Sequence, residues 1–324
     1  MPRAIRIHEY GGPEVLRFEE VPREPLDRRQ VRIRHTAIGV NFIDTYERTG
    51  LYPLKLPAVL GREGAGVVIE AGSQVTQFKS GDRVAYVHST AGSYAGERVV
   101  DASRVVVLPA ETSEQQAAAM MLKGLTAWFL LRRCYRVKRN SPILLHSASG
   151  GVGLIALQWA VALGASVIAV VSTDAKSEVA HRHGAKHVIV SSRENLVERV
   201  REITKRRGVA VVYDGVGKDT FFASLDCLMP RGLMVSYGNA SGPVPPVTPL
   251  ELSKRGSLYL TRPTLYHYIA KASELARGAR KLFEIVGSGR VQVRIGQTYA
   301  LAEAAQAHRD LEARRTTGST LLVP

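Results

Sequence analysis

The residues with the most direct chemical meaning form a glycine-rich turn. An apolar strand that begins at Ile143 runs into this turn, where Gly150, Gly151, Val152 and Gly153 open an apolar helix. Glycine allows the backbone to turn sharply and approach a phosphate, while free N–H groups and the positive end of the helix face the anion. The spacing departs from strict G-x-G-x-x-G, and the alternative is an ordinary turn that binds nothing. We interpret the turn as the pyrophosphate site of a dinucleotide-dependent hydride-transfer enzyme.

The end of the next apolar strand indicates which dinucleotide is bound. In NAD-selective sites an acidic residue about 20 residues beyond the glycines accepts a hydrogen bond from the ribose 2′-hydroxyl. Here that strand ends in Ser172 and Thr173. Lys176 follows one turn later, and Arg193 lies after the next strand. Small hydroxyls and cations suit a phosphate dianion, so we predict NADPH. Asp174 argues against this choice, and Lys176 has the alternative of being an ordinary solvated lysine.

Length and cysteine content bound the class of protein. The 324 residues allow one large or two average domains. Cys134 and Cys227 are too few for a disulfide framework, and the N-terminal sequence lacks a signal-peptide pattern. No apolar run approaches the roughly 18–20 residues that span a bilayer. We therefore expect a cytoplasmic protein without a membrane segment.

The charge balance raises the question of nucleic-acid binding. Lys plus Arg number 44 against 29 Asp plus Glu, giving a formal net charge of +15. These charges are spread from Arg3 to Arg315, without a basic helix or an aromatic stacking motif. A dispersed excess is typical of a solvated surface, so we predict no nucleic-acid partner and keep RNA binding as an alternative of a different class.

The elements that must position these residues fall into two patterns. Short strands and turns fill the first ~120 residues, with strands expected over 3–7, 30–34, 64–70, 83–86 and 104–108. A helix pattern over 114–122 marks the border, and from a second helix over 127–134 onward helices and strands alternate. This alternation predicts an α/β fold with a doubly wound parallel sheet. One helix is expected from about 266 to 287 and a last strand over 319–323.

Several motifs resemble one family. They lie at 11–16, 39–46, 50–53, 123–126, 150–153, 213–217 and 231–235. The chain resembles the medium-chain dehydrogenase/reductases and, within them, the zinc-free quinone oxidoreductases related to zeta-crystallin. The resemblance implies a β-rich, GroES-like catalytic domain made of residues 1–122 and 263–324. It also implies a Rossmann NADPH-binding domain over 123–262 and a homodimer.

The resemblance also bears on zinc. Zinc-dependent relatives supply Cys, His and Glu or Cys ligands. This chain has Asn41 near the first ligand position and Arg62 where a relative would carry the histidine. We therefore predict no metal, although His35, His88 and His146 are conceivable isolated ligands.

Without a Lewis acid, alcohol oxidation loses the group that stabilises the alkoxide. Quinones and activated alkenes accept hydride readily, and hydrogen-bond donors suffice for the delocalised oxyanion. Asn41 offers amide N–H groups, and Tyr46 and Tyr52 offer hydroxyls, as donors or proton relays. Alternatively, Asn41 bridges a turn or touches the ribose and the tyrosines wall the pocket. We predict metal-free hydride transfer from NADPH to a quinone, with reduction of a conjugated enone or enal as the enzymatic alternative.

The resemblance adds further cofactor-binding residues. It implies that Phe42, Ile43, Asp44, Thr45, Tyr46, Lys123 and Thr126 approach the nicotinamide, and that Gly150, Gly151, Val152, Ser172, Thr173 and Lys176 approach the phosphates and the adenosine ribose. Tyr237, Gly238, Asn239, Thr261 and Arg262 would continue the cleft, with Arg314 reaching in from the tail. Ser191 stands where close relatives tend to carry a tyrosine, so recognition of the 2′-phosphate would depend on Lys176 and Arg193.

Overall fold

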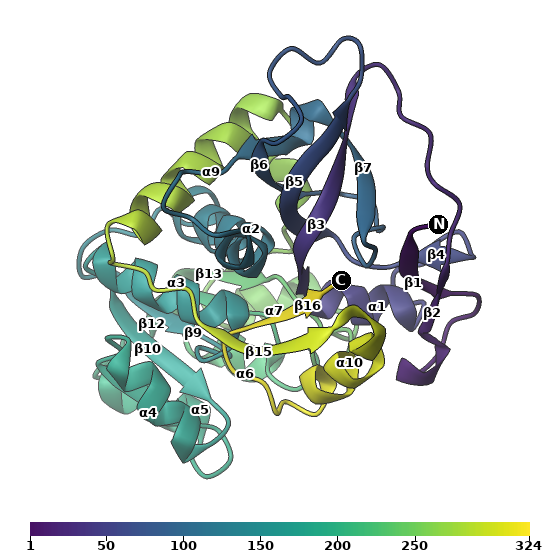
Figure 1. The fold of residues 1–324 in the computed structure, drawn as a ribbon. Coiled ribbons are helices and arrows are strands. Elements are labelled where there is room, and N and C mark those ends of the chain that lie inside the picture. Colours follow the sequence, from purple (N-terminus) through teal and green to yellow (C-terminus); the bar gives the residue numbers. More distant parts are fainter. The chain divides into compact units, whose positions relative to one another are not determined.

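The computed structural model describes residues 1–324, which form two compact units (Figure 1). Unit 1 contains residues 1–125, 269–287 and 293–324. Unit 2 contains residues 126–268 and 288–292. The expected domain borders, at 122/123 and 262/263, lie within a few residues of these divisions, whereas the return of 288–292 to unit 2 was not predicted.

Unit 1 is built on two sheets. The larger, seven-stranded sheet has the order β15-β16-β3-β5-β6-β8, and β7 also pairs with β3. A three-stranded sheet has the order β2-β1-β4. The bounds are β1 Arg3–Ile7, β2 Arg17–Glu20, β3 Gln30–Val40, β4 Ala58–Val59, β5 Glu63–Ala71, β6 Arg83–Val87, β7 Glu97–Asp101, β8 Val105–Val107, β15 Ile295–Ala300 and β16 Ser319–Val323.

The strand β3 is longer than the alternation over 30–34 predicted, because its two halves enter different cores. Val31 and Ile33 pack in one apolar cluster, and Ile38 and Val40 pack in another. Irregular pairing with β5 between these halves accompanies the change of core. The far end of β3 therefore lies in a buried setting, directly before Asn41.

Two helices that begin in unit 1, α1 Phe42–Arg48 and α2 Glu114–Phe129, carry candidate residues, and α2 continues past residue 125 into unit 2. The other helices of unit 1 are α9 Ala272–Gly287 and α10 Ala304–Glu312, with 3₁₀ helices η1 Pro13–Val15, η2 Ala102–Arg104 and η4 Leu301–Glu303. A Cβ on Gly124 would lie 2.4 Å from the Leu282 side chain, so α2 and α9 pack closely only because this position is glycine. The expected separate helix over 127–134 is wrong: α2 continues to Phe129 and then becomes the π-helix η3, Leu130–Cys134.

The single helix expected over 266–287 is also wrong. The structure has a short helix α8, Leu265–Tyr268, and then α9 from Ala272. Between them the Arg104 guanidinium donates to the carbonyl oxygens of Ile269 and Ala270, at 2.7 and 2.8 Å. In a continuous helix these carbonyls would accept hydrogen bonds from main-chain N–H groups. At the break, a distant arginine replaces those donors.

Unit 2 is a parallel six-stranded sheet with the order β11-β10-β9-β12-β13-β14. Its strands are β9 Pro142–Leu145, β10 Ser166–Val171, β11 His187–Val190, β12 Val209–Asp214, β13 Leu228–Ser236 and β14 Tyr259–Thr261. Its remaining helices are α3 Gly151–Ala162, α4 Asp174–Arg182, α5 Leu196–Ile203, α6 Phe221–Asp226 and α7 Pro249–Lys254. The expected doubly wound parallel sheet is confirmed. In this topology β9 is flanked by β10 and β12, so the strand order reverses beside the glycine turn, which is where such sheets bind ligands.

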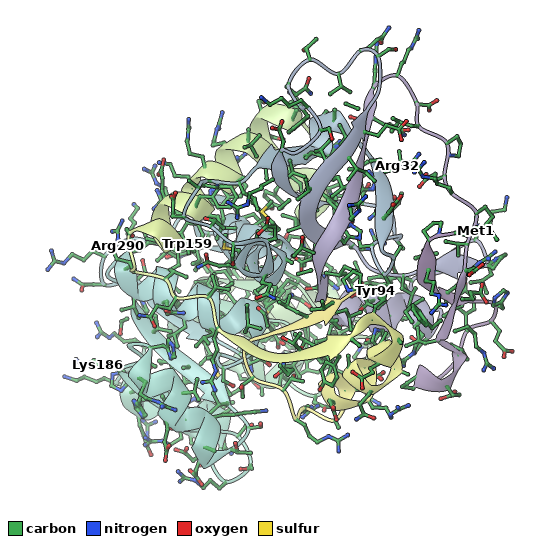
Figure 2. All side chains as sticks on the ribbon, in the orientation of Figure 1. Met1, Arg32, Tyr94, Trp159, Lys186 and Arg290 are labelled. Carbon is green, nitrogen blue, oxygen red and sulfur yellow. The ribbon has the colours of Figure 1, made fainter.

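None of the helices has both the length and the apolar character that a membrane span requires. The basic side chains Lys186 and Arg290 are exposed and extend away from the ribbon of unit 2 (Figure 2). Their solvated position is what a dispersed charge excess predicts for individual lysines and arginines.

Candidate active site

The glycine turn of unit 2 has the shape of an anion cradle. Gly150 precedes α3 without a side-chain cap, and its N–H donates to the Ser147 carbonyl at 2.9 Å. A Cβ on Gly153 would lie 2.0 Å from that same carbonyl oxygen, so only glycine lets the helix approach the turn. The first turn of a twelve-residue helix therefore keeps its N–H groups for an outside acceptor, as a bound phosphate requires. The predicted residues Gly150, Gly151 and Val152 fit a dinucleotide here.

The predicted residues for the 2′-phosphate are only partly brought together. Lys176 Nζ lies 3.5 Å from Ser172 Oγ, and the Thr173 hydroxyl caps α4 by accepting from the Lys176 N–H. Arg193 instead binds Asp174, with 2.8 Å between Nη2 and Oδ1. This ion pair neutralises the charge of Asp174, the acidic residue that argued against NADPH. Because both partners are largely exposed, a phosphate can compete for the guanidinium at small energetic cost.

The predicted residues Ser191, Tyr237 and Gly238 also lie in unit 2. The Ser191 hydroxyl donates to the Val171 carbonyl at 3.1 Å, so it ties together two neighbouring strand ends. A Cβ on Gly238 would lie 2.4 Å from the Gly215 carbonyl oxygen, and the Tyr237 ring lies against Gly215. The turns after β12 and β13 therefore touch each other only because glycine occupies both positions.

Asp214 organises this edge of unit 2, and the sequence analysis missed its role. Its fully buried Oδ1 accepts the N–H groups of Val216 and Gly217 at 2.8 and 3.1 Å. Its Oδ2 accepts the hydroxyls of Thr220 and Ser224 at 2.7 and 2.9 Å. The signal in the sequence was an aspartate at the end of an apolar strand directly before a Gly-x-Gly turn.

The three histidines considered as isolated ligands are held separately. Ser224 accepts from His146 Nε2 at 2.9 Å while donating to Asp214, so His146 carries its proton on Nε2, and burial lowers its pKa. His35 bonds to the Ala95 carbonyl and the Tyr86 hydroxyl. His88 bonds to Thr90. Throughout residues 1–324, no three His, Cys, Asp or Glu side chains meet in a way that could hold a metal ion.

The best-defined polar cluster of unit 1 is centred on Glu63, at the start of β5. This carboxylate is completely buried. Its Oε1 accepts from Asn41 Nδ2 and from Lys123 Nζ, each at 2.9 Å, and its Oε2 accepts from the Leu122 N–H at 2.7 Å. Glu63 was not among the predicted site residues, because its significance depends on α2 lying beside β5. Its signal was a charged residue directly before the apolar run from Gly64 to Ile69.

Asn41 is positioned by both its main chain and its side chain. It precedes α1, and its N–H donates to Asp44 Oδ2 at 2.8 Å. Its amide nitrogen donates to Glu63 and, at 3.4 Å, to the Gly39 carbonyl. Both amide N–H groups that we predicted as donors to a substrate therefore point at protein oxygens. In this geometry the Asn41 amide holds Glu63, and donation to a substrate stays a prediction.

A buried hydrogen-bond chain supports α1 from behind. Arg48 donates to His308 Nδ1 at 3.1 Å and forms two hydrogen bonds with Glu312. Because arginine cannot accept, His308 carries its proton on Nε2, which lies 3.0 Å from the Tyr94 hydroxyl oxygen. Tyr94 in turn donates to Asp44 Oδ2 at 2.9 Å. The chain connects α10 to the first turn of α1.

Burial disfavours the charged forms of the titratable groups in the interior of unit 1. Burial raises the pKa of Asp44 to about 7, and the nearby Glu47 carboxylate adds to the rise, while hydrogen bonds from Asn41 and Tyr94 oppose it. Burial lowers the pKa of His308 to about 3. Asp44 was predicted to approach the nicotinamide, but its side chain is completely buried, so a contact with a cofactor would have to use its main chain.

Arg62 also forms hydrogen bonds with groups in the interior of unit 1. Its guanidinium donates to the buried Glu47 carboxylate and to the Ser89 carbonyl. Burial raises the pKa of Glu47, and the hydrogen bonds from Arg62 oppose this rise. A guanidinium has no lone pair to give to a metal, so Arg62, which stands at the expected position of a ligand histidine, cannot act as a ligand.

The predicted tyrosines form an aromatic cluster on and after α1. The rings of Tyr46 and Tyr52 are 5.4 Å apart, edge to face, and Phe42 lies 6.3 Å from Tyr46. The Tyr52 N–H donates to the Tyr46 carbonyl, and the Thr45 hydroxyl donates to the Phe42 carbonyl. These half-buried rings form an apolar and aromatic wall with phenolic edges.

The remaining predicted residues divide between the units. Unit 1 holds Ile43, Lys123 and Arg314, and unit 2 holds Thr126, Asn239, Thr261 and Arg262. Arg314 has a left-handed backbone (φ 59°) directly after α10, and Thr126 is almost fully buried. Thr261 ends β14, and Arg262 follows it.

The comparisons with known proteins cover both units. Residues 27–110 match the model of the alcohol dehydrogenase GroES-like domain, and residues 151–284 match that of the zinc-binding dehydrogenases. The second description names zinc, whereas the predicted ligand positions of this chain hold Asn41 and Arg62.

Full-length relatives are more specific. The chain is 52% identical to a quinone oxidoreductase of Pseudomonas aeruginosa and 44% identical to a 2-haloacrylate reductase of a Burkholderia species, with at least 99% of each protein covered. Its structure matches that of the Escherichia coli quinone oxidoreductase complexed with NADPH at a TM-score of 0.98 and 48% identity, covering 99% and 100% of the two chains. The chain belongs to the quinone oxidoreductases of the medium-chain dehydrogenase/reductase superfamily.

Proposed function

We propose that this protein reduces a quinone by direct, metal-free hydride transfer from NADPH. The observation that carries the proposal is the full-length similarity to the Escherichia coli enzyme, whose structure was solved with NADPH. The parallel sheet of unit 2, which reverses its strand order beside the glycine turn, supports it as well. In this proposal unit 2 is the cofactor-binding domain and unit 1 supplies the groups that act on the acceptor.

The residues of unit 2 fit NADPH. The uncapped first turn of α3 would bind the pyrophosphate, and Gly153 keeps that turn open. Ser172 and Lys176 would bind the 2′-phosphate, with Arg193 released from Asp174 to assist. When bound, NADPH supplies the hydride. The protein has to orient the acceptor and exclude water around it.

The residues of unit 1 suit an acceptor whose oxygen becomes negative. Tyr46 and Tyr52 offer an aromatic surface for a flat ring and hydroxyls at its edge. Hydrogen-bond donors fixed in a partly buried site stabilise a developing oxyanion more than water does, because they need not reorganise. We propose these tyrosines as acceptor-contacting residues and Asn41 as a positioning residue.

The proposal is tested by measuring oxidation of NADPH and of NADH with a panel of quinones, enones and alcohols, each with and without a chelator. We expect quinone reduction that prefers NADPH and does not respond to the chelator. Chelator-sensitive alcohol oxidation would contradict the metal-free assignment.

Reduction of an activated carbon–carbon double bond is a second candidate. The relative named 2-haloacrylate reductase, at 44% identity over the whole chain, favours it. The same hydride-transfer geometry serves both acceptors. Higher kcat/KM for 2-haloacrylates or enones than for every quinone of the panel would establish this candidate instead.

We also propose a homodimer that acts in the cytoplasm. The edge strand β14 pairs only with β13, and its Tyr259 and Leu260 side chains are 63% and 38% exposed. An apolar edge strand with unpaired main-chain groups is suited to pairing with a second copy. Both cysteines are free, as is usual in a reducing compartment.

A further inference from the structure

We propose that the Lys123 ammonium is the catalytic proton donor to the reduced acceptor, and that Glu63 and Asn41 position it. This inference rests on the proposed function, because it assigns the group that protonates the acceptor oxygen. It extends the implied role of Lys123, which was contact with the nicotinamide.

The geometry fixes the ammonium firmly. Lys123 belongs to α2, its side chain is 6% exposed, and its only hydrogen-bond partner in the structure is Glu63, at 2.9 Å. Glu63 cannot turn away, because Asn41 Nδ2 holds the same oxygen and the Leu122 N–H holds the other. An ammonium has three N–H bonds, and Glu63 uses one of them. The other two have no acceptor in the protein.

Stability alone is a poor reason for this arrangement. Burying an ammonium and a carboxylate costs desolvation that their attraction only partly repays, and apolar side chains of similar size often serve as well. The neighbouring buried cation in the sequence, Arg62, is bonded to Glu47 and to the Ser89 carbonyl. Lys123 is therefore the buried cation beside Asn41 with N–H bonds unused by the protein.

A proton donor of this kind would accelerate the reaction. Hydride transfer adds two electrons and one hydrogen to the quinone and leaves one oxygen as an anion. As an O–H bond forms there, an N–H bond of Lys123 breaks, and its electron pair stays on nitrogen. The products are neutral hydroquinone, NADP⁺ and a neutral amine, which regains a proton from solvent. The overall reaction is quinone plus NADPH plus H⁺ to hydroquinone plus NADP⁺.

The first test uses Lys123→Met in the full-length protein. We expect kcat for quinone reduction to fall about a hundredfold or more, the range typical of a lost general acid or oxyanion donor, with little change in the KM for NADPH. Exogenous methylamine should restore part of the activity of Lys123→Ala. The matched control is Lys79→Met, an exposed lysine of unit 1, which should behave as wild type.

A double variant distinguishes the loss of a catalytic group from a loss of stability. Lys123→Met leaves Glu63 buried without its cation, whereas Lys123→Met with Glu63→Gln removes both charges and should recover thermal stability. Activity should stay low in the double variant. Wild-type kcat in this folded double variant would overturn the proposal and leave the pair a structural role.

A binding measurement separates the donor role from turnover. The probe is 4-nitrophenol, because its phenolate imitates the hydroquinone anion. Its binding is followed by absorbance in the presence of NADP⁺. We expect at least about tenfold weaker phenolate binding in Lys123→Met than in Lys79→Met, the loss of one charge-assisted hydrogen bond. Equal binding in both variants would overturn the proposal. If wild type reduces no quinone, the proposed function fails; if wild type and Lys123→Met are equally active, only this inference fails.

Discussion

Asn41 ends a strand, begins a helix and holds a carboxylate at the same time. Its main chain bonds to Asp44 and its amide to Glu63, so one residue links the support of α1 to the charged pair with Lys123. Residues that act through such networks are recognised only when their partners are known. The sequence named Asn41 as a candidate residue, but its bond to Glu63 could not be predicted.

At the residue scale, Asp44 makes the stability of the protein depend on pH. Its folded pKa of about 7 exceeds the unfolded value of 3.8, so the unfolded state loses its proton first and Asp44 lowers stability as pH rises from about 4 to 7. Asp44→Asn removes this contribution. The unfolding free energy of the variant minus that of wild type should therefore increase from pH 4 to pH 8.

Urea denaturation at several pH values checks this prediction. His308 acts in the opposite direction, because its folded pKa of about 3 lies below 6.5 and its contribution is lost as pH falls. It is present in both proteins and cancels in the difference. A difference that is flat or decreasing with pH would show that Asp44 titrates normally.

The choice of dinucleotide is also decided by single residues. Lys176→Ala removes the cation that faces Ser172, so we expect the KM for NADPH to rise roughly tenfold or more. The KM for NADH should change much less, because NADH lacks the 2′-phosphate. Initial rates with both cofactors measure the effect. The control is Arg193→Ala. Its KM for NADPH should rise less, because Asp174 already binds that guanidinium. Equal rises for both cofactors would remove Lys176 from the phosphate site.

At the scale of elements, the approach of α3 to the preceding turn is the most sharply defined contact. Gly153→Ala would place a Cβ 2.0 Å from the Ser147 carbonyl oxygen, whereas Gly150→Ala would place one at 3.3 Å. Overpacking of the first kind costs about 1–3 kcal/mol. We expect Gly153→Ala to lower Tm by about 5 °C, several times more than Gly150→Ala. Thermal melts followed by circular dichroism compare them, and equal Tm values would mean that α3 can shift freely.

Elements were predictable where local pattern and tertiary role agree. The strands of unit 2 are apolar runs bounded by turns, so their existence and the parallel sheet followed from the sequence. The break between α8 and α9 did not, because Arg104, far away in the sequence, takes the carbonyls. Glu63 was missed for the same reason: a buried charge has a meaning only beside its partner Lys123. Local patterns carry no information about such pairs.

At the scale of the whole molecule, assembly depends on β14. If two copies join through this edge, a charge at Leu260 would be buried without a partner, which is strongly unfavourable. Leu260→Glu should therefore convert a dimer to a monomer. Val107→Glu is the matched control, because Val107 is 55% exposed on β8, an edge strand of the unit 1 sheet.

Sedimentation equilibrium over a range of concentrations distinguishes the outcomes. We expect wild type and Val107→Glu to be dimers and Leu260→Glu to be largely monomeric, with a two-state melt that shows unit 2 still folded. A dimer that persists in Leu260→Glu would place the interface elsewhere, and a monomeric wild type would reject the dimer itself. Because β14 pairs with β13, whose end lies just before Gly238 and Asn239, a dimer through this edge would brace the sheet that we propose binds the cofactor. The monomeric variant should then also bind NADPH more weakly, which fluorescence titration measures.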